Sequence, residues 1–255
     1  VPISLELKEE ENFEINPDRI KKLINKKTRA ILINTPSNPT GTVLNKKLLE
    51  EIADIAVEYD LYVFSDEAYE KLVYDTKHIS IGSLNGMHNY VVTFQTFSKS
   101  YAMCGFRVGY AYGPSNVIDA MTKSIHYITL AAPHLSQLVA IKALSLPNKY
   151  IDAMVKEYDR RRIFIVKRLN EIGLNTIEPK GAFYTFSNIK DFKLNSNKFS
   201  NKLLKEAKVA VVPGTEFGKY GEGYIRCSYA TDYRLIGKAM ERLEKFVKRL
   251  KWLLV

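Results

Sequence analysis

The sequence predicts an α/β fold, with a mostly parallel sheet in a larger first domain and a smaller α+β domain at the C-terminal end. In the first half of the chain, short continuous apolar runs alternate with amphipathic helical segments, which is typical of strands covered by helices on both faces. Beyond Gly113 the pattern changes to helices, and then to short strands between helices. Leu146-Pro147-Asn148 is a candidate hinge, so we expect domains over residues 1–150 and 151–255.

In the first half, Asn16 followed by Pro17 predicts a helix that runs to about Ile24, because asparagine caps helices and proline fits their first position. Asn45 can cap a second helix. Its apolar residues fall on one stripe, namely Leu48, Ile52, Ile55 and Tyr59. Apolar runs predict strands over residues 29–34, 61–65, 90–94 and 107–112.

The second half is predicted to be richer in helix. Periodic apolar positions indicate helices over residues 115–127, 133–144 and 150–173. Short strands are expected over residues 183–186, 210–212 and 223–228, and further helices around residues 200–208 and 232–250. This mixture predicts the α+β character of the second domain.

The composition is that of a globular protein, with 46% hydrophobic and 26% charged residues. We expect no membrane partner, because no segment has the apolar length of a membrane span and no secretory signal is evident. The net charge of +10 comes from lysines spread along the chain. Their densest runs, including Arg160-Arg161-Arg162, are interpreted as solvated helix faces, so a nucleic-acid partner is not expected. Cys104 and Cys227 form neither a disulfide framework nor a zinc set, which favours the cytoplasm.

Three segments carry candidate chemistry. Residues 98–110 place one lysine between two serines, with an arginine eight positions later. Such a lysine can form an imine with an aldehyde cofactor, while hydroxyls and a guanidinium can hold the phosphate of that cofactor. Upstream lie Asn-Thr-Pro-Ser-Asn-Pro-Thr-Gly at residues 34–41 and Phe-Ser-Asp-Glu-Ala-Tyr at residues 64–69. Each segment lies at the carboxyl end of a predicted strand, and parallel sheets bind their ligands at this end.

In this order and spacing the three segments resemble the pyridoxal-phosphate (PLP) dependent aminotransferases of the aspartate aminotransferase family, from about the first residues nearly to the last. The resemblance implies the PLP-dependent transferase fold of type I, with a partial large domain over residues 1–150, and a homodimer. It implies an enzyme that moves an amino group from an L-amino acid, of the aspartate or aromatic type, to a 2-oxo acid. The cofactor would be pyridoxal 5'-phosphate, held as an internal aldimine on Lys99.

The resemblance also implies roles for single residues. Lys99 would carry the cofactor and then move a proton at the substrate Cα, and Asp66 would keep the pyridine nitrogen protonated. Asn38 and Tyr69 would hydrogen-bond the phenolic oxygen. Catalytic roles are therefore expected for Lys99, Asp66 and Tyr69, and Glu67 is expected to be structural.

Binding of the anionic groups is implied in the same way. Ser98 and Arg107 would hold the cofactor phosphate, whereas Ser100 is expected at most to cap a helix. Arg226, in Tyr-Ile-Arg-Cys-Ser-Tyr, matches the arginine that binds the substrate α-carboxylate, and Asn38 would also bind the substrate. Glycines in residues 181–184 and 212–218 are expected to serve turns and close backbone approach. The histidines show no metal-ligand spacing, so no metal is expected.

The resemblance also predicts that part of the family pattern is missing. The sequence enters the family pattern partway through, so we expect that a large N-terminal portion of the usual enzyme is absent and that this is part of a longer polypeptide. Its sheet would keep four adjacent strands with bare edges and uncovered apolar faces. Three alternatives remain: a PLP-dependent β-lyase or decarboxylase of the same fold, an aminotransferase-like PLP-sensing domain of a transcription regulator, and an inactive fragment.

Overall fold

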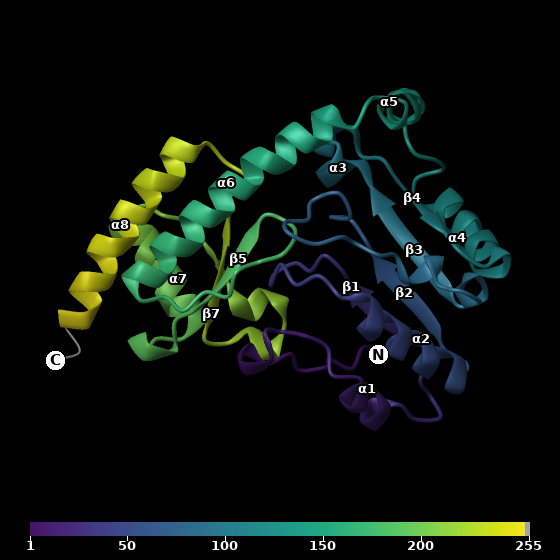
Figure 1. The fold of residues 1–255 in the computed structure, drawn as a ribbon, viewed down its shortest axis with the longest axis horizontal. Helices are drawn as coiled ribbons and strands as arrows, with labels where there is room; N and C mark the ends of the chain where they lie inside the picture. The colour runs from purple at the N-terminus through teal and green to yellow at the C-terminus, as the bar shows by residue number, and fades with distance from the viewer. Residues whose placement is uncertain (253–255) are drawn as a thin grey trace. The chain divides into compact units, whose positions relative to one another are not determined.

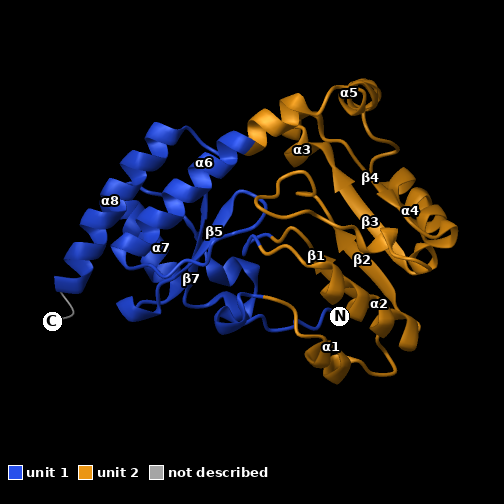
Figure 2. Ribbon diagram, viewed as in Figure 1, with its two compact units in different colours: residues 1–13, 38–41, 156–255 blue, residues 14–37, 42–155 orange. Residues whose placement is uncertain are grey.

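The structure is a computed structural model that describes residues 1–252. Its chain divides into two compact units, which Figure 2 shows in blue and orange. Unit 1 contains residues 1–13, 38–41 and 156 onward, and unit 2 contains residues 14–37 and 42–155. The compact units therefore divide within a long helix and assign two short N-terminal segments to unit 1. The division into domains over residues 1–150 and 151–255 stays a prediction.

Unit 2 is built on a mostly parallel sheet (Figure 1). Its strands are β1 (Ala30–Asn34), β2 (Tyr62–Asp66), β3 (Val91–Thr96) and β4 (Gly109–Tyr112), in the order β1-β2-β3-β4. The first three strands run parallel and β4 is antiparallel to β3. The strands expected from the apolar runs are confirmed, with ends that differ by one or two residues.

The helices of unit 2 are α1 (Pro17–Leu23), α2 (Lys46–Glu58), α3 (Phe97–Ser100), α4 (Ser115–Ile128) and α5 (His134–Leu144), with short 3-10 helices at Ile81–Ser83, Met87–Asn89 and Cys104–Phe106. Four of them, namely α1, α2, α4 and α5, begin within one residue of the predicted positions, whereas the short helix α3 was not predicted. Asn16 and Asn45 cap α1 and α2 as predicted, with side-chain oxygens that accept hydrogen bonds from backbone amides two and three residues later. The apolar stripe of α2 is buried, with Ile52 0% and Ile55 1% exposed. The prediction that Tyr59 belongs to this stripe was wrong, because Tyr59 follows the last helical residue and is 40% exposed.

Apolar side chains are uncovered in unit 2, as expected for a sheet with bare edges. Leu32 on β1 is 73% exposed, and Tyr112 on β4 is 66% exposed. Further large apolar side chains are exposed on or beside α4 and α5, including Tyr127, Ile128, Leu130, Leu135, Leu138, Ile141 and Leu144. Surface of this kind is typical of an interface with further polypeptide.

Unit 1 is an α+β unit. Its antiparallel sheet has the order β5-β7-β6, with β5 (Tyr184–Asn188), β6 (Val212–Pro213) and β7 (Tyr224–Ser228). The long helix α6 (Lys149–Ile172) begins in unit 2 and continues into unit 1, which also holds α7 (Ser196–Ala207) and α8 (Tyr233–Trp252). The 3-10 helices of this unit are Glu9–Glu11, Lys190–Phe192, Gly214–Phe217 and Lys219–Gly221. Phe199 of α7 and Phe246 of α8 pack edge to face and are fully buried.

A partly buried polar cluster fixes the N-terminal segment of the chain within unit 1. Glu9 accepts hydrogen bonds from Asn175 Nδ2 (2.6 Å), Asn188 Nδ2 (2.5 Å) and the Tyr224 hydroxyl (2.9 Å). Burial and the neighbouring Glu9 raise the pKa of Tyr224, so its hydroxyl stays a protonated donor. Among residues 1–252, none of the helices combines the length and the apolar composition that crossing a membrane requires.

Candidate active site

Asp66 is the last residue of β2, and its surroundings fix both its backbone and its carboxylate. Its carbonyl oxygen accepts hydrogen bonds from the Thr35 amide (3.0 Å) and from Asn34 Nδ2 (3.0 Å). Its Oδ1 accepts a hydrogen bond from the amide of Ala68, at 3.1 Å. The carboxylate is therefore held at the carboxyl end of β2, as the sequence predicts.

Ser98 and Arg107 lie at the same end of the sheet. Thr96 at the end of β3 pairs with Gly109 at the start of β4, so Ser98 and Arg107 each lie two residues beyond this pair. The Thr96 hydroxyl caps α3 by accepting a hydrogen bond from the Ser98 amide, at 3.1 Å. Arg107 adopts a left-handed backbone (φ 53°), is exposed, and donates from Nη1 to the carbonyl of Cys104 at 2.8 Å. A hydroxyl and a guanidinium thus flank one end of the β3–β4 pair.

Lys99 and Tyr69 complete the set in unit 2. Lys99 is half-buried in α3, directly after β3, and Phe97 of the same helix is part of a buried apolar cluster with Met103 and Val108. Tyr69 follows β2 by three residues and is only 4% exposed. The structure therefore brings five of the predicted site residues to one end of the unit 2 sheet, namely Asp66, Tyr69, Ser98, Lys99 and Arg107.

The other two predicted site residues, Asn38 and Arg226, form a pair in unit 1. Arg226 lies on β7, and its guanidinium carbon is 4.3 Å from the ring centre of Tyr184 and 4.8 Å from that of Phe217. Its Nη1 donates a hydrogen bond to Asn38 Oδ1 at 2.8 Å. Its Nε is buried and has no hydrogen-bond partner among the described residues. A buried donor of this kind, on a rigid cation, fits a carboxylate ligand.

The turn that carries Asn38 is fixed at Gly41. The carbonyl of Gly41 accepts hydrogen bonds from the amides of Lys180 and Gly181, both at 2.9 Å. Gly41 has φ +72°, and a Cβ on it would lie 2.3 Å from the Cβ of Pro179. Glycine is therefore required here, both for the left-handed backbone and for the close approach.

Arg162 corrects the interpretation of Arg160-Arg161-Arg162 as a solvated helix face. It is 2% exposed on α6 and pairs with Asp159 (2.6 Å) and with Glu178. It also donates a hydrogen bond to the carbonyl of Pro179, the residue that packs against Gly41. Burial of this cation is compensated by partners from a distant segment, which the local run of charges could not reveal.

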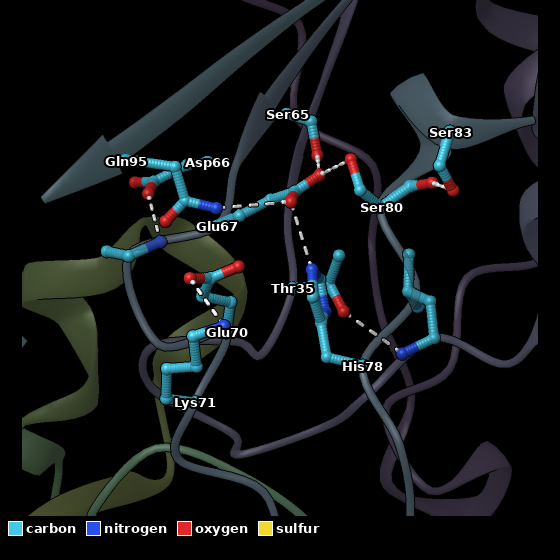
Figure 3. A network of polar contacts seen from close by, with 12 residues as sticks. Thr35, Ser65, Asp66, Glu67, Glu70, Lys71, His78, Ser80, Ser83 and Gln95 are labelled. Atoms are coloured by element: carbon cyan, nitrogen blue, oxygen red, sulfur yellow. Dashed lines mark hydrogen bonds and ion pairs between the residues drawn. The ribbon is translucent and has the colours of Figure 1, made fainter. Parts of the chain in front are cut away.

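Two buried polar groups near the motifs were not indicated by the sequence. Ser100, expected at most to cap a helix, is 1% exposed, and its Oγ has no partner among the described residues. Glu67, expected to be structural, is 1% exposed and accepts hydrogen bonds from several side chains, as Figure 3 shows. The signal that could have found part of this network is the spacing Ser65-x-Glu67 at the end of the apolar run, because these two side chains hydrogen-bond to each other.

The two cysteines differ in their surroundings, which predicts a difference in reactivity. Cys104 is exposed beside Arg107, whereas Cys227 is buried on β7, where burial raises the pKa of its thiol to about 11. Because the thiolate is the nucleophile, we expect iodoacetamide at pH 8 to modify Cys104 and to spare Cys227 in the folded chain. Peptide mapping by mass spectrometry, with the denatured chain as control, checks this. Equal labelling of both thiols before denaturation would contradict it.

The fold and the site together define a class. A mostly parallel α/β sheet with a lysine, an aspartate and an arginine at one end, joined to a smaller α+β unit, is the architecture of the PLP-dependent transferases of fold type I. The sequence matches the family described as aminotransferase class I and II over residues 1–243. The chain belongs to this family.

Individual relatives agree with this assignment. An aspartate aminotransferase of Pyrococcus abyssi is 51% identical over 98% of this chain, and an aromatic-amino-acid aminotransferase of Thermococcus litoralis is 48% identical over 98%. The crystal structure of an aromatic aminotransferase from Pyrococcus horikoshii superposes with a TM-score of 0.93 at 52% identity, over 96% of this chain and 66% of that one. The chain spans 65% of the length of each of the first two relatives.

Proposed function

We propose that this chain acts as a PLP-dependent aminotransferase, with an L-amino acid as amino donor and a 2-oxo acid as acceptor. The observation that carries the proposal is the set of Asp66, Lys99, Ser98 and Arg107 at one end of the unit 2 sheet. The names of the relatives, which are aspartate and aromatic-amino-acid aminotransferases, support a donor of one of these two types.

The chemistry of these side chains fits PLP. A carboxylate at Asp66 suits a protonated ring nitrogen, an amine at Lys99 suits an aldehyde, and Ser98 with Arg107 suits a phosphate. Tyr69 and the side-chain amide of Asn38 would donate hydrogen bonds to the phenolic oxygen. When bound, PLP supplies an electron sink for the bond broken beside the amino-bearing carbon.

The chain's own residues would bind, orient and move the proton. The Asp66 carboxylate, held by the Ala68 amide, would accept a hydrogen bond from the ring nitrogen and favour its charged form. The Nζ of Lys99 would take the proton from the substrate Cα as a general base. Arg226 would bind the α-carboxylate through its buried Nε, while Asn38 holds the guanidinium in place. These roles stay proposals.

We also propose that the protein is a cytoplasmic homodimer. The exposed apolar side chains on α4 and α5 support a contact with further polypeptide. Two cysteines that form no disulfide support a reducing compartment.

The proposed function is tested by trapping the cofactor. We expect the purified chain to gain the mass of one pyridoxyl-phosphate group after incubation with PLP and reduction with borohydride, with the modified peptide containing Lys99. Aspartate or phenylalanine added before reduction should then yield pyridoxamine phosphate, measured by chromatography. No adduct would contradict the proposal, and release of ammonia or carbon dioxide from the substrate would indicate a β-lyase or a decarboxylase instead.

A further inference from the structure

Glu67 is a buried carboxylate with four donor side chains around it (Figure 3). Its Oε1 accepts hydrogen bonds from the hydroxyls of Ser65 (2.9 Å) and Ser80 (2.8 Å). Its Oε2 lies 3.0 Å from His78 Nε2 and 3.4 Å from Gln95 Nε2. We call these five residues the Glu67 network.

The pattern of donors suits a carboxylate, whose two oxygens both accept hydrogen bonds. Nδ1 of His78 is buried and has no partner among the described residues, so a proton there would be unsatisfied and we assign the proton to Nε2. Two hydroxyls, one imidazole N–H and one amide N–H then point at the two carboxylate oxygens, whose lone pairs can accept all four hydrogen bonds. The four hydrogen bonds offset the free-energy cost of burying a charged carboxylate. If the charge is removed, the buried donors lose the acceptor that satisfied them.

The network joins the elements that carry the proposed site. Ser65 on β2 and Glu67, the residue that directly follows β2, lie on either side of Asp66 in the chain. Gln95 is on β3, four residues before Lys99, and the Glu67 amide donates to the carbonyl of Phe94 at 3.0 Å. The network thus fixes the ends of β2 and β3 to each other and to the segment at residues 78–80.

We propose that Glu67 is a positioning residue of the site, which acts by holding the strand ends that present Asp66 and Lys99. This inference rests on the proposed function. It differs from the expectation that Glu67 is merely structural, because it assigns the carboxylate charge an effect on cofactor binding beyond its effect on stability.

The informative variant is Glu67→Gln, which keeps the size of the side chain and removes the charge. An amide has one acceptor atom in place of two and carries no charge, so the four donors lose the charged acceptor that they share and the strand ends loosen. We expect the affinity for PLP to fall at least about tenfold, the size expected when hydrogen bonds to a charged group are lost. In the cofactor-free chain, hydrogen exchange at the amides of Glu67 and Ala68 should become faster.

Two controls separate positioning from general destabilisation. Glu70→Gln makes the same chemical change three residues later, where a half-buried carboxylate outside the Glu67 network pairs with Lys71, and should leave both measurements unchanged. Ile20→Ala removes a buried side chain from α1, an element outside the network, and should lower the melting temperature with PLP affinity within about twofold of the starting chain. Should Glu67→Gln fail to fold, Ser80→Ala removes a single donor and should weaken PLP binding about threefold.

The outcomes are distinct. The inference is overturned if Glu67→Gln binds PLP within about twofold of the starting chain, or if Ile20→Ala loses as much affinity for the same drop in melting temperature. If the starting chain gives no borohydride-stable adduct at Lys99, the proposed function fails on its own. Exchange in the cofactor-free chain then decides whether Glu67 holds the strand ends: unchanged exchange in Glu67→Gln overturns the inference, and faster exchange at Glu67 and Ala68 supports it.

Discussion

Replacing Lys99 with alanine should abolish the borohydride-stable PLP adduct and slow the formation of pyridoxamine phosphate by at least about 1,000-fold. The expected loss is large because one amine would serve both as the nucleophile that holds the cofactor and as the base at the substrate Cα. Lys99 lies in α3 directly after β3, at the sheet end that also carries Asp66, Ser98 and Arg107. The measurements are intact mass after reduction and chromatography of the products.

Two variants make this result specific. Lys99→Arg keeps a positive charge in α3 but cannot form an imine, so we expect the same loss as for alanine. Lys123→Ala removes an exposed lysine from α4 and should leave the adduct and the product yield unchanged. An adduct of undiminished yield on the Lys99→Ala chain would show that another lysine carries the cofactor, and would contradict the assignment.

The residues predicted correctly are those whose signal is local in the chain. Asn16 and Asn45 cap their helices because capping depends on a side chain and amides two or three residues away. The strands lie where continuous apolar runs occur, because strands buried on both faces need such residues at every position. Asp66 and Ser98 reach the same sheet end because parallel strands share their carboxyl edge.

The features that the sequence did not reveal depend on partners distant in the chain. Arg226 reaches Asn38 across a separation of 188 residues, and nothing near either residue indicates the hydrogen bond. Arg162 was interpreted as a surface residue, yet Glu178 and Pro179 give it partners in a buried place. Glu67 likewise looks ordinary until His78 and the two serines are brought around it by folding.

Replacing Arg226 with lysine should lower kcat/KM for the amino-acid donor roughly 100-fold, which corresponds to about 3 kcal/mol at 1.4 kcal/mol for each factor of ten. Lysine keeps the positive charge, but it has no planar guanidinium group to lie over the rings of Tyr184 and Phe217. It also lacks the buried Nε, which has no hydrogen-bond partner among the described residues. A flexible ammonium group would bind the carboxylate through fewer hydrogen bonds and leave Asn38 Oδ1 without its present donor. The borohydride adduct on Lys99 should be unaffected, because Lys99 and Arg226 belong to different compact units.

A donor without a carboxylate provides the decisive comparison for Arg226. If the guanidinium binds the α-carboxylate, the starting chain should prefer phenylalanine over phenylethylamine strongly. Arg226→Lys should lose most of that preference, because its reaction with phenylalanine slows while its reaction with phenylethylamine stays at the low rate of the starting chain. Arg234→Lys, an exposed arginine at the start of α8, should keep the preference of the starting chain. If Arg226→Lys instead slows both donors by the same factor, the arginine stabilises the turn at Asn38 and does not bind the substrate carboxylate, because only a group that contacts the carboxylate can distinguish the two donors.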